Sequence, residues 1–171
     1  VELLAELRSV PPLRLPAAYL DHGLRPEAER REDLDLVDRA CASLGVPLHR
    51  GALAPGLLER RARESGRSLE ELAREFRHRF LSSTADRLSC ELIALGHTAD
   101  DQAETVLYRI LRGSGLSGLS GILPVTGQSI VRPLLELDRG EIECWLRKRH
   151  LAWREDVTNE DRAYARNRLR H

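Results

Sequence analysis

The sequence predicts an α/β fold: a doubly wound, mainly parallel sheet flanked by helices, Rossmann-like in its layering. Short apolar runs alternate along the chain with longer segments whose apolar residues recur at helical spacing. Two of the apolar runs end in turns that carry a histidine and aspartates, at residues 21–23 and 96–101. Open α/β sheets bind ligands at the carboxyl ends of their strands, so the pattern that predicts the fold also predicts a site.

Capping and turn residues delimit the expected elements. Ser68 with Glu71 three residues later has the pattern of a capping box, and Thr98 with Asp101 repeats it, so each pair marks a helix start. Gly45 stands where the preceding helix should stop. In chain order we expect a helix from Val1, a strand over 13–20, a helix over 27–44, a strand over 47–53, a helix over 69–88, a strand over 92–96, a helix over 100–112, a Gly/Ser-rich loop over 113–121, an extended piece at 130–131 and a helix over 138–149.

The chain length predicts a single domain over residues 1–171, because a domain of this size buries roughly 70% of the surface of its unfolded chain. No apolar run approaches the roughly 20 residues of a membrane span, and no secretory signal is visible, so we expect no membrane partner. Cys41, Cys90 and Cys144 form no CxxC pair. That spacing argues against a zinc or iron–sulfur site and against a disulfide framework, and it favours the reducing cytoplasm.

The charges balance, with 27 basic and 27 acidic residues, but their distribution is uneven. Residues 147–171 hold eight basic groups against four acids, which predicts a basic tail over about 151–171 that faces phosphate. Arg166 and Arg168, on either side of an asparagine, suit phosphate or nucleic acid. A solvated face or a frayed terminus is the alternative interpretation.

Residues 96–105 read Gly-His-Thr-Ala-Asp-Asp-Gln-Ala-Glu-Thr and are the most informative stretch. His97 stands at the strand end, and Asp100, Asp101 and Glu104 fall on the first turns of the following helix. Acids in a first turn complement the helix dipole, each contributing about 0.3–1 kcal/mol, and this explanation would suffice for one acid. Three crowded acids repel one another unless a cation lies among them. A metal ion or a substrate ammonium group is the functional interpretation, and both interpretations stay open.

Two further pairs are candidates for binding. Asp21 and His22 close the first strand, although aspartate before glycine is also ordinary turn chemistry. Arg74 and Arg77 lie three residues apart, on one face of a helix, and could clamp an anionic group. Their alternative is pairing with neighbouring glutamates on the helix surface.

Residues 113–118, Gly-Ser-Gly-Leu-Ser-Gly, match the dinucleotide fingerprint GxGxxG but follow a helix rather than a strand. We therefore reject a Rossmann signature here. With Arg112 beside it, the segment that starts at Gly113 could still cradle phosphate through its amides, and a plain connecting loop is the alternative.

Six segments carry a family resemblance: LDHGLRPEAERRED, LEELAREFRHRFL, GHTADDQAET, LRGSGLSGLSGI, VRPLLEL with EI, and EDVTNEDRAYARNRLRH. In order and spacing, from about residue 13 to the end, they resemble the catalytic domain of the tRNA(Ile)-lysidine synthases. The GHxxDDQxET element is shared with the wider N-type ATP pyrophosphatases. The DHGLR element and the RNRLRH ending are more specific to the lysidine synthases.

This resemblance implies the adenine nucleotide α-hydrolase type of fold and an ATP-dependent ligase. Such an enzyme adenylates the 2-carbonyl of the wobble cytidine in a tRNA(Ile) with a CAU anticodon, and lysine then displaces AMP to give lysidine. The implied cofactors are ATP and Mg²⁺. The implied partners are tRNA(Ile) and L-lysine, and a homodimer is a further expectation.

The resemblance also assigns roles to residues, motif by motif. Asp101 and Glu104 would be catalytic, receiving the lysine ammonium or Mg²⁺, and Arg74 or Arg77 would contact ATP phosphate or the cytidine. The remaining assignments are nucleotide contacts by Asp21, His22, His97, Arg112 and Gly113, and substrate or RNA contacts by Asp100, Arg166 and Arg168.

The family's SGGxDS phosphate loop and its preceding strand are absent before Val1, and the chain contains no methionine. We therefore expect the protein to continue upstream, because that loop should bind phosphate at a helix N-terminus. Two alternatives remain: another N-type ATP pyrophosphatase, such as a tRNA 2-thiolation enzyme, or a non-catalytic nucleotide- or RNA-binding module. The related thiolation enzymes usually carry CxxC pairs, which this chain lacks.

Overall fold

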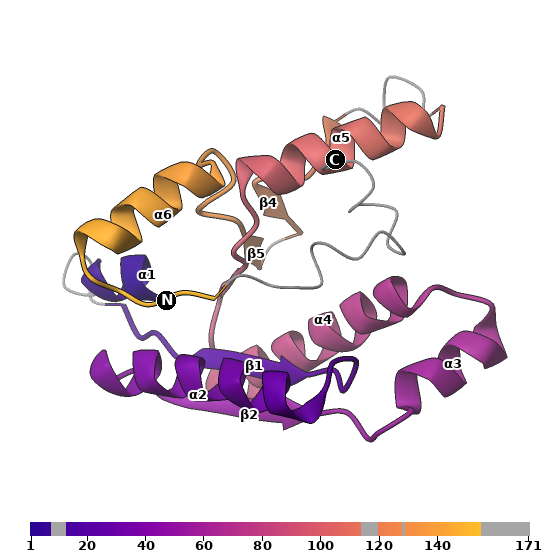
Figure 1. Ribbon diagram of the computed structural model, residues 1–171, viewed down its shortest axis with the longest axis horizontal. Coiled ribbons are helices and arrows are strands. Elements are labelled where there is room, and N and C mark those ends of the chain that lie inside the picture. Colours follow the sequence, from indigo (N-terminus) through magenta and orange to yellow (C-terminus); the bar gives the residue numbers. More distant parts are fainter. Residues whose placement is uncertain (8–12, 114–119, 128, 155–171) are drawn as a thin grey trace. The chain divides into compact units, whose positions relative to one another are not determined.

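The computed structural model describes residues 1–7, 13–113, 120–127 and 129–154. Helices and short strands largely alternate along the chain (Figure 1), as the sequence predicts. The chain divides into two compact units, Val1–Cys90 and Glu91–His171. Each is described below by itself. No helix in the described ranges combines the length and apolarity that a membrane crossing requires.

The first unit pairs two parallel strands that are connected through a helix. Ala17 lies opposite Leu48, and the ladder runs to Asp21 opposite Ala52. The elements of this unit are α1 (Glu2–Glu6), β1 (Ala17–Asp21), α2 (Glu27–Ser43), β2 (Leu48–Ala52), α3 (Leu57–Ser65) and α4 (Leu69–Leu88).

One face of α2 forms the core against this strand pair. Cys41 of α2 packs with Ala17 of β1 and with Val46, and all three are buried. Val37 and Leu48 extend the cluster. Because α2 covers the pair and its loop returns the chain to β2, the end of β1 is fixed beside the start of α2.

The long helix α4 begins at the predicted capping box. The Glu71 N–H donates to Ser68 Oγ at 3.2 Å, and the Ser68 N–H donates to Glu71 Oε2 at 3.2 Å. Farther along α4, Phe80 packs over β2 at Gly51, where a Cβ atom would lie 2.6 Å from the ring. Glycine at position 51 therefore sets how closely α4 approaches the strands.

The second unit is built on a three-stranded sheet in the order β3-β5-β4. The strands β3 and β5 are parallel, with Ala94 opposite Val131, and β4 is antiparallel to β5. Its described elements are β3 (Ile93–Ala94), α5 (Ala99–Leu111), β4 (Val125–Thr126), β5 (Ile130–Val131) and α6 (Arg139–Lys148).

The structure shortens two predicted strands. The strand predicted over 13–20 is paired only from Ala17, because Pro16 has no N–H to donate to a ladder. The strand predicted over 92–96 is paired at Ile93–Ala94 alone, since its partner β5 is two residues long.

Two elements were not predicted, α3 and β4. Charged residues dominate α3, which obscures its apolar face, and β4 has two residues, too few for a periodic pattern. The described strands also form two separate ladders rather than one continuous sheet.

We predict that Gly51→Ala lowers the free energy of unfolding by about 1–3 kcal/mol, because the added methyl group must displace the Phe80 ring. Gly96→Ala is the matched control, since no atom lies within 4 Å of its added Cβ. Urea unfolding of the full-length variants measures both effects. Equal stability of the two variants would contradict the close packing of Phe80 on β2.

Candidate functional site

Asp21, the last residue of β1, builds the turn that follows the strand. Its Oδ1 accepts a hydrogen bond from the Gly23 N–H at 2.8 Å, and its Oδ2 forms an ion pair with Arg30 of α2. Gly23 has a φ of +73°, a backbone conformation that glycine adopts without strain. The turn interpretation of Asp21 is thus present in the structure, and the turn holds the neighbouring His22 in place.

His22 is half-buried at this turn. Its Nδ1 atom is buried and has no hydrogen-bond partner among the described residues. Burial lowers the pKa of its imidazole, the positive charge of Arg77 lowers it further, and the Asp21 carboxylate opposes both effects. His22 is therefore neutral at pH 7, and a buried polar atom without a partner is costly enough to suggest a bound group.

Arg77 and Arg74 both lie on α4, and both are exposed. The charge of Arg77 acts on His22, so the α4 arginine and the β1 turn share one corner of the unit. Arg74 forms no ion pair with any described residue. The alternative that the sequence left open was pairing with a neighbouring glutamate on the helix surface. Other arginines form such pairs, because Glu75 pairs with Arg67 and Arg79.

In the second unit, two of the acids support helix starts. Asp101 Oδ2 accepts a hydrogen bond from the Thr98 N–H at 2.9 Å, within the capping box that begins α5. Asp100 Oδ2 accepts one from the Arg139 N–H at 2.8 Å, at the first residue of α6. The structural roles that the sequence left open for these acids are therefore present. Glu104 follows on α5, half-buried.

His97 lies between β3 and α5 and contacts a residue to which sequence reasoning assigned no role. Its Nδ1 accepts a hydrogen bond from Arg132 Nε at 3.3 Å. Arg132 comes directly after β5 and is only 6% exposed. The signal available in the sequence was the arginine itself, placed between an apolar strand and Pro133, where a charged residue must find partners.

Two other residues of α5, also without a predicted role, hold the chain where it returns after the Gly/Ser-rich loop. Gln102 Oε1 accepts a hydrogen bond from the Ile122 N–H at 2.5 Å, and Arg109 donates to the Gly121 carbonyl at 3.0 Å. The Gln102 amide also fills the space where a Cβ of Gly121 would lie. One face of α5 therefore anchors the segment that leads into β4.

The predicted phosphate loop is described only at its start. Arg112 stacks on the Tyr108 ring, 4.6 Å from the centroid, and Gly113, two residues after the end of α5, has a φ of +73°. Residues 114–119 of the loop lie outside the described residues, and so do Arg166 and Arg168 of the basic tail.

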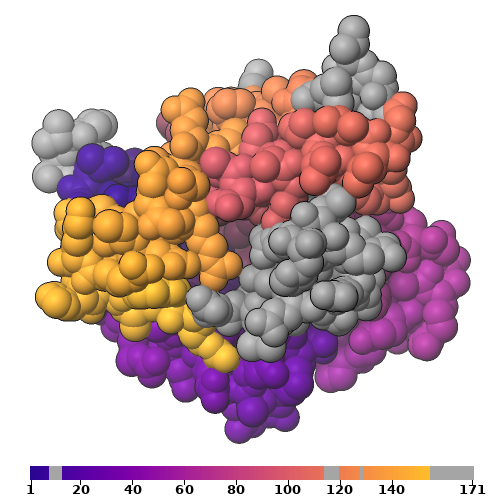
Figure 2. Space-filling model, turned by 45° about the horizontal axis from the view of Figure 1, so that its top comes forward, coloured from indigo at the N-terminus to yellow at the C-terminus, as the bar shows by residue number. Residues whose placement is uncertain are grey.

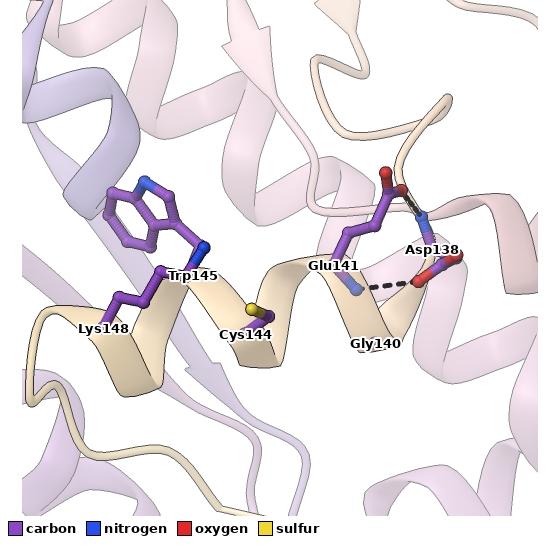
Figure 3. Close-up of a pocket in the computed structure, with 6 residues that line it drawn as sticks. All are labelled: Asp138, Gly140, Glu141, Cys144, Trp145 and Lys148. Carbon is purple, nitrogen blue, oxygen red and sulfur yellow. Dashed lines mark hydrogen bonds between the residues drawn. The ribbon is translucent and has the colours of Figure 1, made fainter.

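A surface hollow lies on α6 and holds none of the predicted site residues (Figure 3). Asp138 and Glu141 bond to each other's backbone N–H groups there, as the capping box of α6. Orange and yellow spheres mark the residues of this helix in the space-filling view (Figure 2). The hollow is lined by Asp138, Gly140, Glu141, Cys144, Trp145 and Lys148.

Within the described ranges, no three His, Cys, Asp or Glu side chains come together as a metal site. The structure brings Asp21, His22 and Arg77 together in the first unit, and it joins His97 to Arg132 in the second. That the two strand ends form one site stays a prediction.

Comparisons with known proteins agree with the predicted fold. A PP-loop domain model matches residues 1–171. The chain resembles a solved structure, the U34-tRNA thiolase NcsA from Methanococcus maripaludis with its [4Fe-4S] cluster, with a TM-score of 0.72 and 18% identity over 90% of this chain and 53% of that chain. This likeness concerns the fold alone, and it confirms the α/β prediction.

Curated relatives named tRNA(Ile)-lysidine synthase match most of the chain. The protein of Solibacter usitatus is 47% identical over 161 residues, which cover 93% of this chain and 34% of the relative. That of Porphyromonas gingivalis strain W83 is 41% identical, covering 91% and 33%, and that of Thermotoga maritima is 39% identical, covering 99% and 40%. The chain thus spans between about a third and two fifths of the length of these relatives. Because the PP-loop model matches it from end to end, the chain belongs to the PP-loop domain family.

Proposed function

We propose that this chain is the catalytic domain of an enzyme that uses ATP to join lysine to the wobble cytidine of a tRNA(Ile) with a CAU anticodon. The observation that carries the proposal is 39–47% identity to lysidine synthases over more than nine tenths of the chain. In the proposed reaction the cytidine 2-carbonyl oxygen attacks the α-phosphorus of ATP and diphosphate leaves. An amine of lysine then attacks the activated C2, and AMP leaves.

The corner of Asp21, His22 and Arg77 supports nucleotide binding. A guanidinium group offers a fork of donors that matches phosphate oxygens, and Arg77 presents one from an exposed position on α4. Arg74 is one helical turn earlier and has no competing ion pair among the described residues. The Nδ1 atom of His22, which has no hydrogen-bond partner among the described residues, would bond to a polar group of the nucleotide.

The acids of α5 support binding of a cation. Asp101 commits Oδ2 to Thr98, while its Oδ1 accepts no hydrogen bond from the described residues. Glu104 is three residues later, so both carboxylates can serve one ligand. We propose that they receive the lysine ammonium group.

The same oxygen donors fit Mg²⁺, which binds through one or two carboxylates together with substrate phosphates. Asp101 and Glu104 would hold the ion, and it would supply neutralisation of phosphate charge. Asp100 Oδ2 accepts a hydrogen bond from the Arg139 N–H at the start of α6, so any contact with RNA would share that carboxylate.

The proposal also assigns contacts to the start of the Gly/Ser-rich loop and to the basic tail. Arg112 and Gly113 would contact phosphate, and Arg166 and Arg168 would contact the tRNA. Under this proposal the chain is one catalytic domain of a cytoplasmic enzyme, with a homodimer as its assembly.

The deciding experiment incubates the full-length protein with ATP, labelled lysine and tRNA(Ile) that carries a CAU anticodon. We expect label in the wobble nucleoside, dependent on ATP, with release of AMP. A tRNA with a different wobble base is the control. A folded protein that incorporates no lysine would refute the proposal. In a parallel reaction that holds a sulfur donor in place of lysine, formation of a thiolated nucleoside would assign the chain to the alternative enzyme class.

We predict that Glu104→Gln raises the KM for lysine by tenfold or more while ATP affinity changes less than twofold. The reason is that a charge-assisted hydrogen bond to the ammonium is worth about 1.5–3 kcal/mol, and under the ammonium assignment Glu104 serves lysine rather than the nucleotide. A comparable loss of Mg²⁺-dependent ATP binding would instead support the Mg²⁺ assignment. Glu91→Gln, an exposed glutamate just before β3, removes the same charge and is the control. Equal loss of lysine use and of Mg²⁺-independent ATP binding would make Glu104 a structural residue.

We predict that Arg77→Met raises the pKa of His22 part of the way toward its ordinary value of 6.5, because burial, the larger cause, remains. NMR titration of the His22 ring measures this change. Since the folded pKa lies below the unfolded one, the contribution of His22 to stability falls as the pH drops below 6.5 and becomes constant below the folded pKa. In Arg77→Met the two pKa values lie closer together, so the stability lost on acidification should be smaller.

The same Arg77→Met variant should weaken ATP binding by roughly tenfold or more, through loss of one charge-assisted contact. Arg87→Met, on the same helix and also exposed, is the control for the loss of an arginine. If Arg87→Met changes the His22 titration as much as Arg77→Met does, the assignment of the electrostatic effect to Arg77 is wrong.

A further inference from the structure

Arg132 has a fixed guanidinium group in the second unit. Its Nη1 donates to the Leu123 carbonyl at 2.6 Å and to Thr126 Oγ1 at 2.7 Å. Its backbone N–H donates to the Pro124 carbonyl at 2.9 Å. Arg132 is only 6% exposed, and these contacts hold its Nη1 atom. The orientation of the planar guanidinium group, and with it that of the Nε–H, is therefore fixed.

Strand pairing brings that N–H to His97. The parallel strands β3 and β5 place Ala94 opposite Val131, and the Leu95 N–H donates to the Val131 carbonyl at 3.0 Å. Arg132 is the next residue after Val131, and His97 is two residues after Leu95. The Arg132 Nε then lies 3.3 Å from His97 Nδ1.

The chemistry of the two groups settles which one donates. A guanidinium group has N–H donors and no acceptor, and it stays protonated in proteins. The nitrogen that faces it must therefore offer a lone pair, so His97 Nδ1 carries no proton. In the neutral imidazole the proton is then on Nε2.

We infer that Arg132 is a positioning residue that fixes His97 as the Nε2–H tautomer. With Nδ1 occupied and Nε2 protonated, the ring presents a hydrogen-bond donor and no base. Such a donor suits a phosphate or carbonyl oxygen that gains negative charge. That use in the reaction rests on the proposed function, whereas the tautomer does not.

The test is long-range proton–nitrogen NMR of the full-length protein labelled at its histidine rings, at neutral pH without substrates. His97→Asn identifies the His97 signals among those of the other histidines. We expect one tautomer, with Nδ1 unprotonated and Nε2 protonated. A proton on His97 Nδ1 in the unmodified protein would overturn the inference without any variant.

Two variants test the cause. Arg132→Met removes the donor and should shift both His97 nitrogen signals toward values averaged over the two tautomers. Arg132→Lys keeps the charge on a flexible stem, should shift them in the same direction by less, and serves if the Met variant does not fold. Arg109→Met is the control, because it removes a different arginine contact of the same unit, the hydrogen bond to the Gly121 carbonyl. It should leave the His97 nitrogen signals unchanged.

Unchanged His97 signals in a folded Arg132 variant would overturn the inference, and so would an equal shift in Arg109→Met. Since no substrate is present, either result leaves the proposed function standing. Conversely, a failure to form lysidine would not alter the tautomer. The two claims can therefore fail separately.

Discussion

Parallel pairing of short strands is the constraint on which both units depend. In the first unit, the β1–β2 ladder ends at Asp21, so the turn that carries His22 starts where backbone pairing stops. In the second, two paired residues in β3 and β5 are enough to bring His97 and Arg132 together. A shift of either ladder by one residue would turn these side chains to the opposite face.

Many of the polar residues at these strand ends have a structural role as well as a proposed chemical one. Asp21 braces its turn through Gly23 and Arg30, and Asp101 completes the capping box of α5. Asp100 supports the first residue of α6. When one oxygen of such a carboxylate accepts a hydrogen bond from a backbone N–H at a helix start, the carboxylate is oriented, and its other oxygen can bind a ligand. For that reason stability and binding should be measured together in variants of these residues.

Arginine supplies the positive charge at both corners, but its surroundings give it different tasks. Arg77 is exposed, and its charge lowers the pKa of His22. Arg132 is buried, so its donors are committed to a carbonyl, a hydroxyl and an imidazole. A buried guanidinium is costly unless its donors are used, and here their use orients a histidine.

The sequence by itself determined the α/β class, the capping boxes at Ser68 and Thr98 and the strand ends that carry His22 and His97, because capping, periodicity and turn chemistry act over a few residues. Only the tertiary structure decided that Arg77 acts on His22, that Arg132 holds His97 and that Gly51 admits Phe80. The residues of these pairs are 55, 35 and 29 positions apart in the chain. Contacts over such separations depend on strand register and helix packing, which no local pattern encodes.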